Sequence, residues 1–210
     1  MKNTKTRAVC ALLTHIAASA LAIMAISFFF TRDTFSIIGV EGVTCFRFFT
    51  IDSNVLAAVS CLAMIPFDIR ALKGDDTQLP SWVVKLRFAG TVVVTLTLLV
   101  VLCYLMPVQG AELMVAGGNL YLHLICPPLV IAAFLFFESG NLQRRDAWIG
   151  VLTVLVYAVV YLVMVVALGK WPDFYNFNDN NTWPYFFTGI MLFTYLISRL
   201  LVFLGSKLKN

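Results

Sequence analysis

Long apolar segments alternate with short polar ones along the whole chain. A helix needs roughly 20 apolar residues to cross a hydrocarbon core about 30 Å thick, and the segments reach that length. They predict transmembrane helices near residues 8–30, 45–67, 83–106, 112–137, 147–168 and 184–204. We therefore expect an all-α integral membrane protein, built as a single six-helix transmembrane domain over residues 1–210.

The first apolar segment also has features of a signal peptide, because Lys2, Lys5 and Arg7 precede it and Ala18-Ser19-Ala20 lies within it. A signal peptide has an apolar core of about 7–15 residues. Here the apolar stretch continues to Phe30. A retained helix is the expectation.

Basic residues are distributed unequally between the two sides of such a bundle. If both termini share one side, twelve of the 15 Lys and Arg residues fall on it: Lys2, Lys5, Arg7, Arg70, Lys73, Lys85, Arg87, Arg144, Arg145, Arg199, Lys207 and Lys209. The remaining three are Arg32, Arg47 and Lys170. Cytoplasmic loops carry the excess of positive charge, so both termini are predicted to be cytoplasmic.

Composition supports a multi-pass membrane location and excludes several classes of function. Hydrophobic residues make up 60% of the chain and charged residues only 12%, with a mean hydropathy of +0.89. The net charge is +4, and the basic residues are dispersed over short loops. They therefore indicate the orientation of the helices in the membrane, and binding of nucleic acid is not expected. The five cysteines form no C-x-x-C pair, so neither a disulfide framework nor a metal site is indicated, and no cofactor is expected.

Polar side chains cluster at the start of the second predicted helix, in Phe48-Phe49-Thr50-Ile51-Asp52-Ser53-Asn54. Polar groups at membrane depth are costly, and they usually indicate function. At about 100° per residue, one face carries Arg47, Thr50, Asn54 and Cys61. Asp52 points about 200° away from Thr50, toward another helix or the outer water.

The fourth predicted helix carries a histidine within an apolar run. Asn119 and His123 are four residues apart and share a face. Pro127 and Pro128 lack the backbone donors that the carbonyls of His123 and Leu124 would accept in an α-helix, which predicts a kink below His123. An imidazole with a pKa near 6.5 beside such a kink can take up and return a proton at neutral pH.

The predicted helix ends allow, but do not require, contact between these two stretches. Thr50 lies about 7 Å and His123 about 16 Å below the outer edge at 1.5 Å per residue, with a boundary error of about 3–6 Å. Purely structural roles compete: a threonine hydroxyl often bonds to its own preceding turn, and a histidine can link two helices. His15, in the first helix, is expected to be such a packing histidine.

Four features in order resemble one family of membrane proteins: Phe48-Phe49-Thr50-x-x-Ser53-Asn54, Asn119-x-x-x-His123 with Pro127, Gly169-x-Trp171-Pro172, and the six-helix layout. The family comprises the androgen-induced and androgen-dependent TFPI-regulating proteins and their bacterial relatives. The resemblance implies hydrolysis of fatty acid esters of hydroxy fatty acids, with Thr50 as nucleophile and His123 as general base. Animal members carry an aspartate where Ser53 stands here, which leaves the ester substrate open. A bacterial member would lie in the cell membrane.

The resulting hypothesis is an intramembrane ester hydrolase acting on long-chain lipids. Asn54 or Asn119 would donate to the oxyanion or orient the imidazole, and Ser53 and Arg47 would contribute to substrate binding or orientation. The alternative is a lipid-binding or proton-linked transport protein that uses the same polar stripe without covalent chemistry. For both hypotheses the site could open to lipid or to the outer water. The sequence does not indicate an oligomeric state.

Two further stretches bear on this site. Phe186-Phe187-Thr188 repeats the Phe-Phe-Thr sequence at the start of the sixth predicted helix, and coincidence is the simplest explanation in a chain with 18 phenylalanines. The aromatic stretch 171–175 is expected to anchor the last outer loop at the membrane interface. A lid over the site is the alternative.

Overall fold

Six helical segments dominate the computed structural model, which describes residues 2–31, 41–75, 78–138 and 141–208. In this described part, six segments are long and apolar enough to cross a membrane: Lys5–Ser27, Phe49–Leu72, Ser81–Gln109, Gly118–Phe137, Arg144–Ala167 and Trp183–Leu208. The six predicted helices are thus confirmed. The second begins four residues later than expected and the fourth six residues later.

Several of the segments are composite. The helical elements, in chain order, are α1 (Lys2–Ser27), η1 (Gly42–Arg47), α2 (Phe49–Leu72), α3 (Ser81–Val100), η2 (Val101–Leu105), α4 (Met106–Gln109), α5 (Ala111–Val115), α6 (Gly118–Leu120), η3 (Tyr121–Ile125), α7 (Cys126–Ala132), η4 (Ala133–Phe137), η5 (Arg144–Asp146), α8 (Ala147–Leu162), η6 (Val163–Ala167), η7 (Asp179–Asn181) and α9 (Trp183–Leu208). Four of these, η2, η3, η4 and η6, are π-helical turns that continue a membrane-spanning helix.

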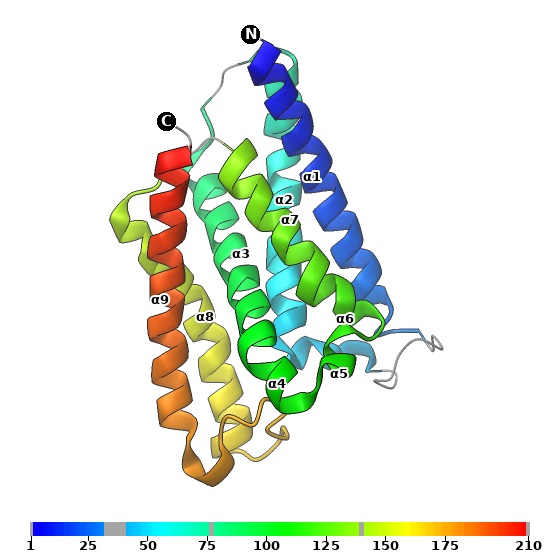
Figure 1. Cartoon of the computed structure of the whole chain (residues 1–210), viewed down its shortest axis with the longest axis vertical. Helices are drawn as coiled ribbons and strands as arrows, with labels where there is room; N and C mark the ends of the chain where they lie inside the picture. The colour runs from blue at the N-terminus through cyan, green and yellow to red at the C-terminus, as the bar shows by residue number, and fades with distance from the viewer. Residues whose placement is uncertain (1, 32–40, 76–77, 139–140, 209–210) are drawn as a thin grey trace.

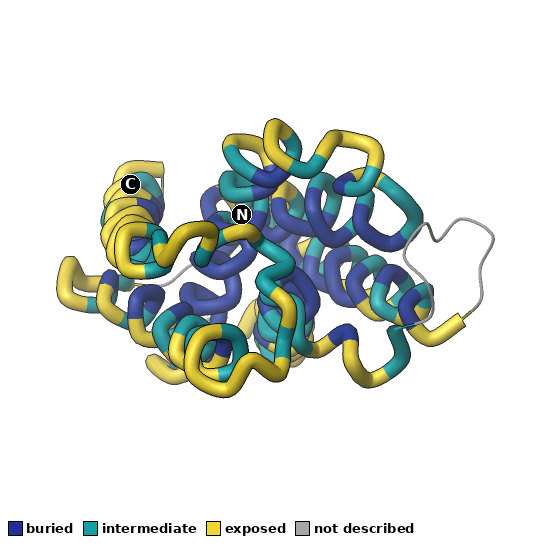
Figure 2. The backbone as a smooth tube through the Cα atoms, turned by 90° about the horizontal axis from the view of Figure 1, so that it is seen from below, coloured by how far each residue is buried: buried dark blue, intermediate teal, exposed yellow. Residues whose placement is uncertain are grey.

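Helix α3 lies at the centre of the bundle and packs against α2, α7, α8 and α9, while α1 packs against α2 and α7 (Figure 1). The largest core cluster joins α3, η4, α8 and α9: Phe88, Val92, Val93, Leu96, Phe134, Leu135, Val154, Ile197, Leu201 and Val202. Figure 2 shows that the buried residues face the interior of the bundle. Because α3 lies at the centre of the bundle, side chains on nearly every face of this helix are buried.

The outer surface of the bundle is also apolar. On α9, four large hydrophobic side chains one turn apart are exposed: Leu192, Leu196, Leu200 and Phe203. Soluble proteins rarely expose apolar patches of such extent. The exposed stripe is therefore suited to contact with lipid tails, in agreement with a multi-pass membrane protein.

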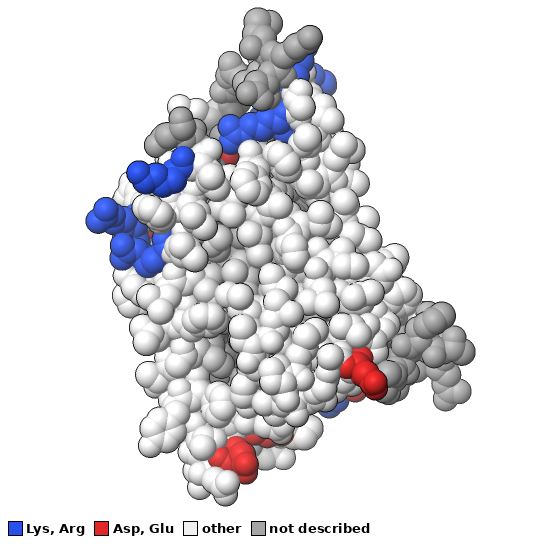
Figure 3. All heavy atoms as spheres, in the orientation of Figure 1, with Lys and Arg blue, Asp and Glu red and all other residues white. Residues whose placement is uncertain are grey.

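Both ends of the described chain lie at the same end of the bundle (Figure 1). On the face that Figure 3 shows, most Lys and Arg side chains gather at that end, and the larger acidic patches lie toward the other. Arg87, counted on the side of the termini, lies inside α3, within the predicted span 83–106, and it is 1% exposed, so it is a buried charge and does not belong to a loop. Arg32 and Lys209, also counted, lie outside the described residues.

The predicted fourth helix is divided in two, because Gly117 adopts φ 52° and ψ −128°, a conformation that favours glycine. The next residue, Gly118, lies against α1. A Cβ atom at position 118 would be 2.5 Å from the backbone oxygen of Ala25. The absence of a side chain therefore lets α6 and η3 approach α1 closely.

We expect Gly118→Ala to destabilise the protein by about 1–3 kcal/mol, because the backbone atom it meets cannot give way as a flexible side chain would. Thermal unfolding of the purified protein in detergent measures this. Gly189→Ala is the matched control, since a Cβ at that α9 position meets no atom within 4 Å. An equal melting temperature for the two variants would contradict the steric argument.

Candidate active site

Thr50 and His123 meet inside the bundle. Thr50 lies in the first turn of α2 and His123 in the π-helical turn η3, and Thr50 Oγ1 is 3.2 Å from His123 Nε2. Both side chains are buried, with exposed fractions of 9% and 3%. The contact places the two residues at the same level of the bundle.

The second ring nitrogen of His123 determines which atom carries the proton. His123 Nδ1 is 2.7 Å from the carbonyl oxygen of Met114. A carbonyl only accepts hydrogen bonds, so Nδ1 must be the protonated nitrogen. The lone pair of Nε2 therefore faces Thr50, whose hydroxyl donates to it. A hydroxyl bonded to an oriented imidazole is the arrangement that activates a nucleophile.

The break between α5 and α6 makes the Met114 carbonyl available. Helix α5 ends at Val115, and Ala116 is extended, with φ −74° and ψ 133°. In a continuous α-helix the Met114 carbonyl would accept from the amide of Gly118. The break leaves this oxygen free to hold the imidazole. A segment near residue 115 that looked like uninterrupted helix in the sequence thus supplies the third member of the site.

The proline pair acts differently from the prediction. We expected a kink with free carbonyls at His123 and Leu124, but the chain passes through a π-helical turn and continues as α7. In the i→i+5 register of that turn, Pro127 is the missing donor for the carbonyl of Leu122. Asn54 Nδ2 donates to this oxygen at 3.0 Å. In the same register Pro128 is the missing donor for the carbonyl of His123, so the free pair is Leu122 and His123 instead of His123 and Leu124, and α2 supplies the partner of Leu122.

Asn54 and Ser53 both hold the backbone of Thr50. Asn54 Nδ2 also donates to the Thr50 carbonyl at 2.8 Å, so its two hydrogens are both engaged. Ser53 Oγ donates to the same carbonyl at 3.0 Å and lies 2.9 Å from Thr97 Oγ1 on α3. These contacts make Asn54 and Ser53 positioning residues. Donation from Asn54 to an oxyanion would require one of its two bonds to break.

The other polar candidates lie further from the pair. Asn119 Nδ2 donates to the Leu113 carbonyl at 3.0 Å, which ties α5 to the start of the fourth span. Arg47 precedes α2, in η1, rather than lying on the helical stripe, and its guanidinium forms an ion pair with Glu41 at 3.0 Å. Asp52 lines a groove against α8, away from His123 as its helical angle predicted.

Thr50 lies where two grooves meet. The first, here called the apolar groove, lies between α2, α3, α8 and α9 with a cavity volume of about 80 Å³, and its lining includes Leu96, Val100, Val154, Phe187, Ile190 and Met191. The second, the histidine groove, has a cavity volume of about 250 Å³ and is lined by His123 and Asn119 with apolar neighbours such as Phe29, Ile51 and Leu113. Thr50, Leu105 and Tyr175 line both grooves.

The loop before α9 covers the junction of the grooves. The carboxylate of Asp173 accepts from the hydroxyl of Tyr161 and from the amides of Phe177 and Asn178, which fixes the loop as a tight turn. Gln109 Nε2 donates to the carbonyl of Phe174 at 2.9 Å. The position of this loop agrees with the alternative interpretation of stretch 171–175, a cover over the site.

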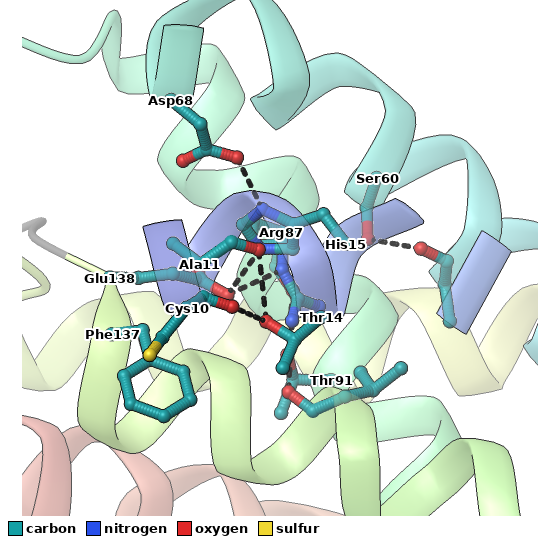
Figure 4. Close-up of polar contacts among 12 residues, drawn as sticks. Cys10, Ala11, Thr14, His15, Ser60, Asp68, Arg87, Thr91, Phe137 and Glu138 are labelled. Carbon is teal, nitrogen blue, oxygen red and sulfur yellow. Dashed lines mark hydrogen bonds and ion pairs between the residues drawn. The ribbon is translucent and has the colours of Figure 1, made fainter. Parts of the chain in front are cut away.

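A second polar cluster lies in the half of the bundle that contains the termini (Figure 4). His15 Nδ1 is 2.6 Å from Asp68 Oδ2, and His15 Nε2 is 3.0 Å from Glu138 Oε1. An imidazole donates to two carboxylates only when both nitrogens are protonated. His15 is thus part of an ionic cluster and is not the simple packing histidine that the sequence suggested.

Arg87 completes this cluster. Its Nε donates to Glu138 Oε1 at 2.8 Å, and its two terminal nitrogens donate to Thr91 Oγ1 and the Val130 carbonyl. Two cations and two anions balance, and the four charged residues are at most 6% exposed. The arrangement is easy to miss, because each charge stands alone in the sequence near the end of an apolar segment.

No known protein family, curated protein or solved structure matches the chain. The resemblance described above therefore stays a prediction. The geometry of the Thr50–His123 pair stands independently of it.

Proposed function

We propose that this protein is an integral membrane hydrolase that cleaves long-chain lipid esters, with Thr50 as nucleophile and His123 as general base. The observation that carries the proposal is the chain of two hydrogen bonds from Thr50 Oγ1 through the imidazole to the Met114 carbonyl. A carbonyl in the third position holds the ring and its tautomer, as the aspartate does in a serine hydrolase triad.

In this mechanism the Thr50 oxygen attacks the ester carbonyl carbon while His123 Nε2 takes its proton. Collapse of the tetrahedral intermediate breaks the bond to the alcohol, which receives that proton from Nε2. Thr50 then carries the acyl group. Water, deprotonated by the same nitrogen, attacks the acyl-enzyme, the bond to Thr50 Oγ1 breaks, and Nε2 returns the proton to Thr50 as the fatty acid leaves. Neither a metal nor an organic cofactor enters these steps.

The two grooves suggest how an ester would lie. The leaving alcohol needs the proton of His123, so it belongs in the histidine groove. The acyl chain then extends from Thr50 into the apolar groove, whose lining is suited to a hydrocarbon chain. This orientation agrees with the largely apolar lining of the first groove and with the polar side chains in the lining of the second.

We further propose that both termini are cytoplasmic, which puts Thr50 in the outer half of the membrane. The gathering of Lys and Arg side chains at the end that holds the termini supports this orientation (Figure 3). Substrates would then arrive laterally from the outer leaflet.

Labelling with a long-chain alkyl fluorophosphonate tests the covalent step, because only an activated nucleophile displaces fluoride from phosphorus. We expect one adduct, located at Thr50 by mass spectrometry, and loss of labelling in His123→Ala. Thr188→Ala is the matched control, since Thr188 also follows two phenylalanines but is exposed on α9. An adduct at Thr188, or no adduct in folded protein, would contradict the mechanism, and the latter would favour the carrier.

A further inference from the structure

The start of α2 presents its backbone amides beside the nucleophile. The first amides of an α-helix have no partner within the helix, and together they form its positive end. In α2, the amides of Ile51 and Asp52 donate to the Phe48 carbonyl at 3.0 and 3.3 Å. The amide of Phe49 instead donates to the phenol oxygen of Tyr175 at 2.7 Å. Burial raises the pKa of Tyr175, and the backbone of Thr50, which also interacts with this oxygen, favours the ionised phenol and lowers this pKa in part.

Tyr175 thus brings a hydroxyl group to the residue that carries the nucleophile. It comes from the loop that covers the junction of the grooves, and its side chain lines both grooves together with Thr50. An accepted hydrogen bond at a positive helix end draws electron density from the phenol oxygen. Tyr175 is therefore a stronger donor than an isolated tyrosine would be.

The proton of Tyr175 is available for a further partner. Its nearest phenol neighbour is Tyr157, at 3.4 Å between the two oxygens. Tyr157 has one proton, and it donates this proton to the carbonyl of Arg47 at 2.7 Å. In the contact of 3.4 Å Tyr157 is again the donor and the Tyr175 oxygen accepts, at the long limit for a bond between hydroxyl groups, so this contact does not use the Tyr175 proton.

We infer that Tyr175 is a further catalytic residue, whose O–H donates a hydrogen bond to the oxyanion that forms when Thr50 attacks the ester. This role rests on the proposed hydrolase function. As the bond from Thr50 to the carbonyl carbon forms, the carbonyl π electrons move to oxygen, and Tyr175 stabilises the charge without transferring its proton. It supplies the donor that Asn54 lacks, because both hydrogens of Asn54 are engaged.

Steady-state hydrolysis of p-nitrophenyl octanoate by the full chain in lipid nanodiscs tests the inference. We expect Tyr175→Phe to lower kcat by about 10²–10³-fold with little change in KM, the loss typical of one oxyanion donor. Tyr185→Phe is the control, since that side chain is 81% exposed and should retain full activity. An unchanged or increased kcat in Tyr175→Phe would overturn the inference about Tyr175. The hydrolase proposal would be overturned separately, by the absence of a fluorophosphonate adduct at Thr50 in the unchanged protein.

A second substitution separates catalysis from support of the helix end. Burial raises the pKa of Tyr175 to about 12, so the phenol stays protonated during the assay. Replacement with 3-fluorotyrosine keeps the hydroxyl but lowers the pKa of the phenol. We expect this variant to restore the activity lost in Tyr175→Phe, with the alkaline decline of kcat moved to lower pH because a phenolate cannot donate. An unmoved alkaline limb would indicate a structural role only.

Discussion

Hydrolysis of p-nitrophenyl octanoate should fall by about 10⁴-fold in Thr50→Ala and by a similar factor in His123→Ala. Thr50→Ala removes the atom that forms the acyl bond, and His123→Ala removes the only group that contacts Thr50 Oγ1 as an acceptor in the described part of the chain. Because the two residues act as one unit, the double variant should be no less active than either single variant. Measurement of kcat/KM for all three tests this.

Two controls make the result specific to the hydroxyl group. Thr50→Ser keeps the nucleophilic oxygen and loses only a methyl group, so it should retain much more activity than Thr50→Ala. Thr188→Ala should be as active as the unchanged protein. Full activity in folded Thr50→Ala would eliminate Thr50 as the nucleophile. Strictly additive losses in the double variant would show that Thr50 and His123 act separately.

The unfolding free energy should fall by about 3–5 kcal/mol in Arg87→Met, because the substitution leaves the buried carboxylate of Glu138 without its guanidinium partner. Methionine fills much of the same space, so the loss reflects charge more than volume. Unfolding by titration with SDS in mixed micelles measures the change. Arg145→Met is the control, since Arg145 is exposed, and its effect should lie within about 0.5 kcal/mol.

A double-mutant cycle identifies the contact responsible. Glu138→Gln removes the negative charge but keeps a group of similar size next to Arg87 and His15. The double variant Arg87→Met with Glu138→Gln should cost less than the sum of the single variants, because one cation and one anion are removed together and the cluster keeps its balance of charge. Additive effects would show that the ion pair is not the source of the loss.

The helix count and the helix faces followed directly from the sequence. Apolar length predicts the six spans, because the bilayer requires about 20 apolar residues per helix. The period of 3.6 residues places Thr50 and Asn54 on one face and Asp52 on another, and the structure has the same arrangement. Arg47 escaped this reasoning, since η1 precedes α2 and breaks the helical period there.

Local pattern also failed where a glycine or a proline changed the helical register. The run 112–137 looks apolar throughout, yet Gly117 divides it, and a π-helical turn shifts the free pair of carbonyls from His123 and Leu124 to Leu122 and His123. A hydropathy profile depends only on the side-chain types, so it is the same whether the backbone is α-helical or π-helical. The positions of the freed carbonyls of Met114 and Leu122 were therefore not predictable from the apolar pattern.

The sequence by itself determined that this protein is helical, apolar enough to span a membrane six times, and provided with Thr50 and His123 on separate helices. Only the tertiary structure decided that their side chains meet at 3.2 Å, that Met114 sets the imidazole tautomer, and that Tyr175 reaches the start of α2. The physical reason is that hydropathy and helical period act over a few turns of one helix. Contacts between helices depend instead on where each one begins, bends and packs.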